Sequence, residues 1–326
     1  GMKSIMFGHD SIKAQQNNIV VAGGLENMTN APYILSKARK GFRMGHADVK
    51  DHMFLDGLED AYEEGKLMGS FAEDTAEHYQ FTREQQDNFA ITSLERAKKA
   101  NEDGTFESEI VPIKVLNRKN EIIINKDEQP FKSDITKIPT LSPAFRKNGT
   151  VTAANSSSIS DGASSVILML ESEALKRGIK PLARIIDHST NSQEPKWFTT
   201  APIGAIEKVL EKSGWKKTDV DLFEVNEAFA VVPMAVMKDI GISNDILNIY
   251  GGACALGHPV GASGTRIVTT LINALKKNNL KKGVASLCIG GGEATALTLE
   301  IINCCLLYTS DAADDMQCVD LGGRRI

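Results

Sequence analysis

A glycine-rich stretch, Gly251 to Arg266 (GGACALGHPVGASGTR), constrains what this chain can fold into more than any other segment. Glycine at this density allows tight turns and lets backbone come close to a ligand. Pro259 suits the first turn of a helix, and residues 267–277 carry apolar side chains at helical spacing. The sequence therefore predicts a strand, then a glycine-rich turn carrying His258, then a helix. A turn histidine that merely satisfies backbone carbonyls is the alternative interpretation.

Two further segments bring polar groups to the ends of apolar runs. Residues 221–225 lead into Asn226, and residues 284–289 contain Cys288 just before three glycines, 290–292. Ligand sites in layered α/β folds gather at such strand ends. An amide, an imidazole and a thiol are the groups that acyl-transfer chemistry needs. A buried structural thiol is the commoner role for a cysteine taken alone.

Several motifs in the right order resemble the thiolase family and, within it, the acetyl-CoA acetyltransferase group. They cover the chain from residue 1 to about residue 302. The motifs are VVAGGLENMTNAPY (20–33), REQQDNFA (83–90), NGTVTAANSSSISDGA (148–163), NEAF (226–229), GGACALGHPVGASG (251–264) and CIGGG (288–292).

The resemblance implies the α/β thiolase fold, with α/β/α/β/α layers, two related halves and an inserted loop domain. It divides the chain into 1–27, a remnant of the N-terminal half; 28–157, the loop domain that binds CoA; 158–178, the return to the N-terminal half; 179–303, the C-terminal half; and 304–326, a tail. The tail fits no family pattern and resembles translated sequencing-adapter DNA, so we expect it to be non-native and disordered. The N-terminal half is expected to be incomplete.

Strand-like and helical patterns alternate in the C-terminal half, which is typical of a layered α/β sheet. The expected helices are 202–213, 228–240 and 260–277, and the expected strands are 181–186, 221–225, 246–249, 284–289 and 294–302. Earlier in the chain, residues 1–16 have helical spacing and 19–22 and 162–170 read as strands. A capping box at 82–85 predicts the start of a helix, and residues 110–115 and 121–125 predict a hairpin.

The resemblance also implies catalytic roles. Thiolases join two acetyl-CoA molecules, or cleave a 3-ketoacyl-CoA with CoA. The cysteine that takes the acyl group is expected three residues before Gly1, outside this sequence, so we expect this fragment itself to be inactive. His258 would activate that cysteine, and Cys288 would exchange a proton with the substrate's α-carbon. Asn226, through a water, and His258 would face one thioester oxygen, and the N–H of Gly290 would face the other.

Four further residues are implied to contact coenzyme A, which is a substrate and not a permanently bound cofactor. They are Ser157, Leu67, Met68 and Phe229. A serine-rich turn that caps a helix is the alternative for the serines around Ser157. Leu67 departs from the pattern of many biosynthetic thiolases, which carry histidine there, so a degradative thiolase of broader chain length stays open.

Composition narrows the possible partners. A net charge of −5 without a basic cluster argues against nucleic acid, and no apolar run approaches the length that spans a bilayer. Five cysteines lack metal-type spacing, so no metal is expected. The histidines outside the motifs are expected in surface or core roles: His9, His46, His52, His78 and His188. A working thiol suits a reducing, cytoplasmic setting. CoA thioesters and a homodimer or homotetramer are the expected partners.

Two classes of protein compete with this interpretation. Ketoacyl synthases share the fold, but they carry histidine or asparagine at the position of Cys288, which favours a thiolase. The other alternative is a catalytically silent, CoA-binding or unfolded fragment, because a half-built core does not offset the entropy of ordering the chain.

Overall fold

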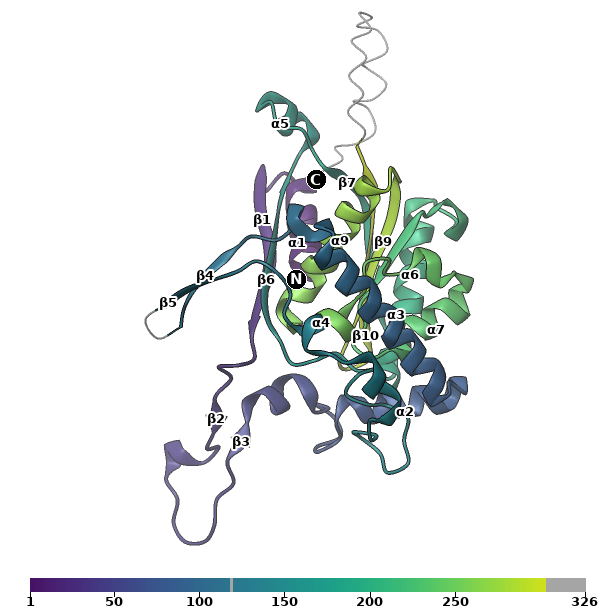
Figure 1. The fold of residues 1–326 in the computed structure, drawn as a ribbon. Helices are drawn as coiled ribbons and strands as arrows, with labels where there is room; N and C mark the ends of the chain where they lie inside the picture. The colour runs from purple at the N-terminus through teal and green to yellow at the C-terminus, as the bar shows by residue number, and fades with distance from the viewer. Residues whose placement is uncertain (118–119, 303–326) are drawn as a thin grey trace, which may run out of the picture.

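The computed structural model describes residues 1–117 and 120–302, in which the chain forms stacked layers (Figure 1). A two-stranded antiparallel ribbon forms the first layer, a pair of helices the second, a four-stranded sheet the third and further helices the fourth. The ribbon pairs β1 (Ile19–Asn27) with β6 (Asp161–Met169), and the helix pair is α1 (Met2–Lys13) with α9 (Val260–Lys277). Two sheets therefore lie on either side of one helical layer.

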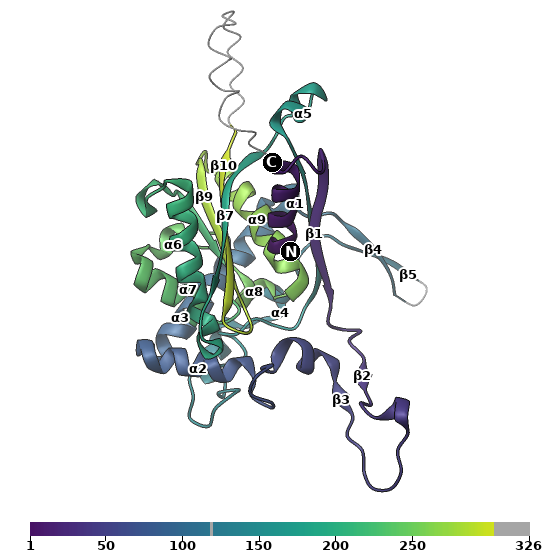
Figure 2. The ribbon, with the colours of Figure 1, turned by 180° about the vertical axis from the view of Figure 1, so that it is seen from behind.

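The four-stranded sheet has the order β7-β10-β9-β8, and its outer face is covered by helices (Figure 2). Its strands are β7 (Ala183–Ser192), β8 (Leu222–Val225), β9 (Lys282–Ile289) and β10 (Glu293–Ile301), and the covering helices are α6 (Ala201–Ser213) and α7 (Val231–Val236). Only the β8–β9 pair is parallel among these neighbours. The residues that come directly after these two strands therefore lie at the same edge of the sheet.

The helical layer owes its position to apolar side chains that face both sheets. In α1, Ile5 and Ile12 are fully buried, and in α9 so are Ile267, Leu271 and Leu275. Burying each such side chain stabilises the fold by about 1.5–3 kcal/mol. The start of α9, which directly follows the glycine-rich stretch, is therefore fixed by its packing.

The segment between β1 and β6 holds small strands and two long helices. They are β2 (Tyr33–Ile34), β3 (Lys50–Asp51), α2 (Met68–Tyr79), α3 (Arg83–Glu102), β4 (Ile113–Asn117), β5 (Asn120–Ile124) and α4 (Gln129–Lys132); α5 (Glu171–Lys176) follows β6. The predicted hairpin is confirmed as β4–β5. The capping box is confirmed too, because Thr82 Oγ1 accepts from Gln85 N (3.2 Å) and Gln85 Oε1 accepts from Thr82 N (2.9 Å).

One predicted strand, 246–249, is wrong. Residues 244–246 form a 3₁₀ turn, and the strand is reduced to a single bridge between Phe223 and Leu247. Asn248 lies in the left-handed region with φ of 46°, which a strand cannot accommodate. Its side chain instead bonds to both backbone groups of Val225, at 2.8 Å each. The predicted helix 228–240 is also shorter, because α7 begins at Val231 and continues as a π-helical turn over 237–241.

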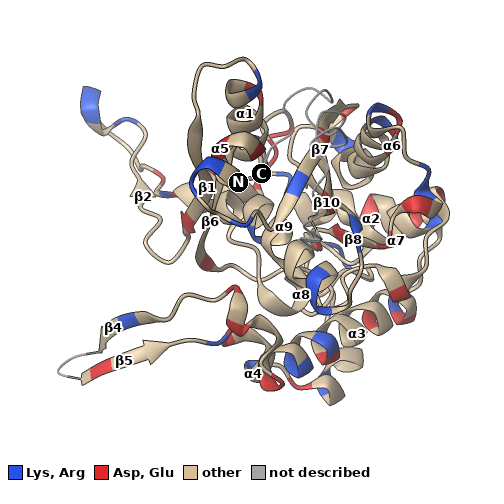
Figure 3. Cartoon of the chain, turned by 90° about the horizontal axis from the view of Figure 1, so that it is seen from above, with Lys and Arg blue, Asp and Glu red and all other residues tan. Residues whose placement is uncertain are grey.

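Surface charge is mixed, and acidic and basic residues lie interspersed along α3 and α6 (Figure 3). Among the described residues, no helix combines the length and the apolar character needed to cross a membrane. The domain boundaries expected from the motifs stay a prediction, and the expected tail, 304–326, lies outside the described residues.

Candidate active site

Asn226 lies where β8 ends, at the edge shared with β9. Val225 stands opposite Ser286 in the parallel register, and the Asn226 N–H donates to the Ser286 carbonyl at 3.0 Å. The backbone hydrogen bonding to β9 therefore continues for one residue beyond the end of β8. The side chain is 1% exposed, and its Oδ1 has no hydrogen-bond partner in the part of the chain that the structure describes. A buried amide oxygen without a protein partner can accept a hydrogen bond from a water or a ligand.

His258 reaches the same edge from the glycine-rich stretch. The short helix α8 (Ala253–Leu256) ends at Gly257, whose φ of 90° favours glycine. A Cβ at Gly257 would also lie 2.0 Å from Ser160 Oγ. The His258 N–H donates to the Ser158 carbonyl at 3.2 Å, and its ring Nε2 lies 3.2 Å from Asn226 Nδ2. The turn at Gly257 therefore holds the His258 imidazole against the side-chain amide of Asn226.

Ser263 decides which tautomer His258 adopts. Its Oγ donates to the Pro259 carbonyl at 3.0 Å and lies 2.6 Å from His258 Nδ1. A hydroxyl has one proton to donate, so with that proton on the Pro259 carbonyl, Ser263 accepts from His258 and Nδ1 carries the imidazole hydrogen. The Nε2 lone pair consequently faces Asn226. Neutral His258 therefore presents a base at the sheet edge.

Burial shifts the pKa values of both titratable groups at the edge. Burial, and secondarily the positive charge of Arg266, lower the pKa of His258 to about 4. Burial raises the pKa of the Cys288 thiol to about 12. At neutral pH the imidazole is therefore uncharged and able to accept a proton, whereas the thiol is protonated and able to donate one.

Cys288 is the penultimate residue of β9 and is 7% exposed. It belongs to the same apolar cluster as Phe229 and Met68. Beyond it, the turn needs φ of 87° at Gly291 and 86° at Gly292. A Cβ built on Gly290 would find Met68 Sδ nearest, at 3.6 Å, apart from its chain neighbours. The positive φ values at Gly291 and Gly292 favour glycine at both positions. The Gly290 N–H therefore lies in a glycine-rich loop, two residues after Cys288.

A buried carboxylate, Glu227, joins the edge to the rest of the molecule. It accepts from Ser93 Oγ of α3 (2.7 Å), Asn248 Nδ2 (2.9 Å) and the Cys254 N–H (3.1 Å). A Cβ at Gly252 would lie 2.3 Å from Glu227 Cδ. Burial raises the pKa of Glu227. The glycine-rich stretch is therefore fixed to β8 and to α3 through one side chain.

The four expected CoA contacts lie on two sides of the edge. Ser157 bonds by both N–H and Oγ to the Ala228 carbonyl, at 3.0 Å each. Phe229 is buried and its ring meets Phe145 edge-on, with centroids 6.0 Å apart. Leu67 and Met68 are half-buried at the start of α2. The structure brings Met68, Phe229 and Cys288 into one cluster, and it leaves contact with CoA as a prediction.

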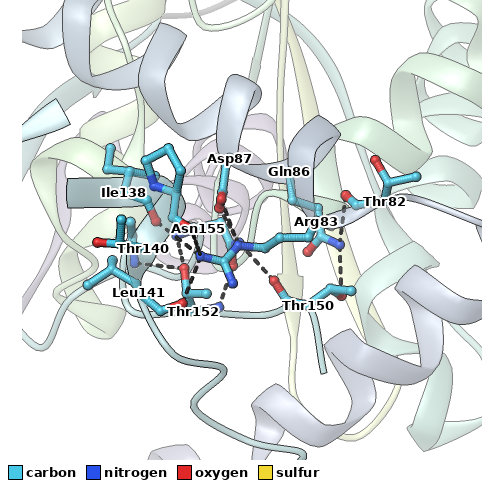
Figure 4. A network of polar contacts seen from close by, with 12 residues as sticks. Thr82, Arg83, Gln86, Asp87, Ile138, Thr140, Leu141, Thr150, Thr152 and Asn155 are labelled. Carbon is cyan, nitrogen blue, oxygen red and sulfur yellow. Dashed lines mark hydrogen bonds and ion pairs between the residues drawn. The ribbon is translucent and has the colours of Figure 1, made fainter. Parts of the chain in front are cut away.

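A network of polar contacts fixes the serine segment onto α3 (Figure 4). Arg83 donates to Asp87 at 2.6 Å and to the Leu141 carbonyl at 2.8 Å. Asn155 Nδ2 donates to the other oxygen of Asp87 at 3.0 Å, and the Asn155 carbonyl accepts from Ala230 N at 2.8 Å. The residues before Ser157 are therefore held between α3 and the turn that comes after Asn226.

Sequence reasoning missed two residues of this arrangement, Ser263 and Glu227. Ser263 lies five positions after His258 in the first turns of α9, and a hydroxyl at that distance was a usable signal. The partner of Glu227 on α3, Ser93, is 134 residues away, and nothing in the sequence pairs them.

The layers and the site together define a layered α/β protein that gathers an amide, an imidazole and a thiol at one sheet edge. The family model described as the thiolase N-terminal domain matches residues 1–172, and that of the thiolase C-terminal domain matches residues 179–301. The chain therefore belongs to the thiolase family. This confirms the family and the α/β thiolase fold that the motifs predicted.

Similar proteins cover most of the chain. A Dictyostelium discoideum protein named "Probable acetyl-CoA acetyltransferase" is 50% identical over 301 residues, which are 92% of this chain and 72% of that protein. The acetyl-CoA acetyltransferase crystal structure from Bacillus anthracis matches with a TM-score of 0.90 at 42% identity, covering 93% of this chain and 76% of that one. The Acat5 thiolase of Ascaris suum in complex with coenzyme A matches with a TM-score of 0.86 at 39% identity, covering 92% and 76%.

Proposed function

We propose that the protein is an acetyl-CoA acetyltransferase, an acyltransferase that joins two acetyl-CoA to acetoacetyl-CoA and performs the reverse thiolysis. The names of the Dictyostelium and Bacillus relatives support the reaction class. The observation that carries the proposal is the 3.2 Å contact between Asn226 Nδ2 and His258 Nε2 at the end of the strand beside Cys288. Coenzyme A is then a substrate, as the Ascaris thiolase complex with CoA supports.

In the first step, His258 acts as the base for the acyl-accepting cysteine expected three positions before Gly1. The start of α1 packs on the first turns of α9, since a Cβ at Gly264 would lie 2.2 Å from Met2 N. A residue just before α1 would therefore lie at the same end of α9 as His258. The helix N-terminus stabilises a thiolate there. His258 Nε2 takes the thiol proton, and the thiolate attacks the 3-keto carbon of acetoacetyl-CoA.

In the second step, the bond between C2 and C3 breaks and its electron pair remains on the departing acetyl-CoA as an enolate. The Cys288 thiol, which its raised pKa keeps protonated at neutral pH, donates its proton to that α-carbon. The resulting thiolate takes the proton of incoming CoA, whose sulfur attacks the acyl-cysteine. The acyl group leaves as acetyl-CoA, the released cysteine thiolate takes back its proton from His258, and the reverse sequence is the condensation.

Donors already in place stabilise the enolate oxygen. Asn226 Oδ1 lacks a partner among the described residues, so it can accept from a water whose second hydrogen faces the substrate oxygen. The Gly290 N–H serves the other thioester oxygen. Preorganised donors of this kind are worth about 3–4 kcal/mol each.

The test is thiolysis of acetoacetyl-CoA together with deuterium exchange at the α-carbon of acetyl-CoA, using protein expressed from the start codon of its natural reading frame. Cys288→Ser is expected to abolish exchange but to keep acyl-enzyme formation, whereas His258→Ala is expected to abolish acylation. If Cys288→Ser exchanges deuterium at the wild-type rate, the role of Cys288 is wrong. Thr92→Ala, which removes a hydroxyl that bonds to the Asn88 carbonyl of α3, is the matched control.

A degradative thiolase of broader chain length is the second candidate, favoured by Leu67. This side chain is half-buried and directly precedes Met68, whose Sδ would lie 3.6 Å from a Cβ built on Gly290. An apolar wall there would accept longer acyl chains. The measurement is kcat/KM for acetoacetyl-CoA against 3-ketohexanoyl-CoA. A higher value for the longer substrate would replace the acetyl-specific proposal, and Leu67→His should then shift the preference toward acetoacetyl-CoA.

A cytoplasmic homodimer or homotetramer completes the proposal. The support for the location is chemical, because Cys288 works as a thiol and a reducing compartment preserves it. Light scattering of the purified protein measures the assembly, and a monomer at micromolar concentration would contradict it. Imaging of the tagged protein in its source cells tests the location.

A further inference from the structure

Three potential metal ligands converge far along α1 from the active site. Asp10 Oδ1 lies 3.2 Å from His9 Nδ1 and 2.8 Å from His188 Nε2. His9 and Asp10 belong to α1, and His188 belongs to β7. All three ligand atoms lie within 4.8 Å of one another. His9 is eight residues into the helix from Gly1, or about 12 Å along its axis, so this cluster is separate from the acyl-transfer machinery.

Two of these side chains are mostly buried and the third is exposed, as in a metal site that opens to solvent on one side. His9 is 4% exposed and His188 13%, whereas Asp10 is 57% exposed. The two rings meet edge-on with centroids 5.1 Å apart, so packing restricts both.

We propose that His9, Asp10 and His188 form a binding site for a divalent transition metal of the zinc class. Two imidazoles and one carboxylate are a ligand set that zinc and its neighbours accept, with remaining positions left to water. Ligands at about 2.1 Å from such an ion lie roughly 3.0–3.4 Å from one another. The two separations that involve Asp10, 2.8 and 3.2 Å, require shifts of only a few tenths of an ångström, and the two imidazole nitrogens lie within 4.8 Å of each other.

The charges around the cluster are compatible with a cation. Lys13 lies one turn further along α1 and disfavours positive charge at His9, but it is exposed and solvent screens it. Lys212 of α6 donates to the His188 carbonyl at 2.9 Å and lies 3.4 Å from Asp187, which offsets its charge. The Asp10 carboxylate is the charge closest to the proposed ion.

A bound ion would connect the helical layer to the first strand of the four-stranded sheet. In the absence of metal, Asp10 can hold both imidazoles through hydrogen bonds, and this is the competing account of the same geometry. The two accounts differ in one property, since hydrogen bonds alone give no saturable metal affinity.

The experiment titrates untagged, chelator-treated protein with Co²⁺, following visible absorbance, and then with Zn²⁺ as competitor. We expect one Co²⁺ per cluster, displaced by Zn²⁺. Asp10→Asn and His188→Gln should each weaken Co²⁺ binding by more than about 100-fold, because loss of even an outer-sphere partner costs 10- to 100-fold. His78→Gln, an exposed histidine on α2, is the matched control and should bind as the wild type does.

Thermal melts of the same proteins provide the second measurement. Zn²⁺ should raise the Tm of the wild type and of His78→Gln but not of Asp10→Asn. The mostly exposed Asp10 can be changed to Asn with its hydrogen-bonding shape retained, so this variant is expected to fold. Absence of saturable Co²⁺ and Zn²⁺ binding, or unchanged affinity in both Asp10→Asn and His188→Gln, overturns the proposal in favour of a hydrogen-bonded cluster.

Discussion

Proton positions at single side chains determine what this site can do. His258 is a base because Ser263 donates its one hydrogen to the Pro259 carbonyl and must accept the other bond from Nδ1. Ser263 itself is fully buried, so no solvent competes for its hydroxyl. The serine thus acts through the histidine, as a positioning residue.

Ser263→Ala should therefore change the tautomer of His258 and not merely the stability of the protein. Without the acceptor, the Nδ1 hydrogen has no partner and the Nε2-protonated form gains population. Long-range ¹H–¹⁵N correlation of the imidazole should show the Nδ1–H form in the wild type and a mixture in the variant. Ser263→Thr, which keeps the hydroxyl, is expected to restore the wild-type pattern. An Nε2–H form in the wild type would refute the assignment.

The Cys288 thiol should resist alkylation in the folded protein. Burial raises its pKa to about 12 from the ordinary value of 9.0, so its thiolate fraction at pH 8 falls about 1,000-fold relative to an ordinary thiol. Peptide-resolved mass spectrometry of iodoacetamide labelling, compared with the same chain in urea, measures the effect at this residue. Equal labelling rates in the two states would contradict the shift.

At the scale of elements, the parallel pair β8–β9 accounts for most of the site. Both strands, and helix α9, were predictable because each is an apolar run or a helical pattern next to glycine or a polar turn. Residues 246–249 show the limit of this reasoning. Their apolar pattern suits a strand, but the left-handed backbone of Asn248 is set by contacts with Val225, which lies 23 residues earlier.

The start of α3 gives a stability prediction for one element. Thr82→Ala removes one half of the capping box and should lower the free energy of unfolding by about 1 kcal/mol. Thr92→Ala on the same helix removes a hydroxyl that bonds only to the helix's own Asn88 carbonyl, and it should change stability by less than about 0.5 kcal/mol. Urea unfolding followed by circular dichroism measures the free energy of unfolding of both variants. An equal decrease in the two would mean that the capping box does not stabilise the helix.

Across the whole molecule, long-range contacts set the limit of what the sequence reveals. The motifs predicted the family fold and brought Asn226, His258 and Cys288 to one edge. They could not pair Ser93 with Glu227, or His188 with Asp10, which lie 134 and 178 residues apart. Such pairs depend on how the layers stack, and local periodicity carries no information about that.

Buried carboxyls at the junction of these layers make stability depend on pH. Burial raises the pKa of Glu224 to about 8, and Arg266, Glu227, Glu109 and Arg96 are the charged groups around it. Arg266 Nη1 lies 3.9 Å from Glu224 Oε2. Because the folded-state pKa is above the unfolded value of 4.5, the folded chain holds more protons between pH 4.5 and 8. Glu224 therefore makes stability fall as pH rises through that window.

Glu224→Gln should remove this part of the pH dependence. At pH 5 the variant is expected to match the wild type within about 1 kcal/mol, because a protonated carboxyl and an amide are similar in shape and polarity. By pH 8 the variant should be the more stable of the two, by an amount on the order of a few kcal/mol, since it has no carboxyl to ionise in an apolar setting. Urea unfolding at half-unit steps of pH measures the difference. The control Glu207→Gln, at an exposed position of α6, should show the same pH dependence of stability as the wild type. If the stability of Glu224→Gln also ran parallel to that of the wild type across pH, Arg266 would already keep Glu224 ionised.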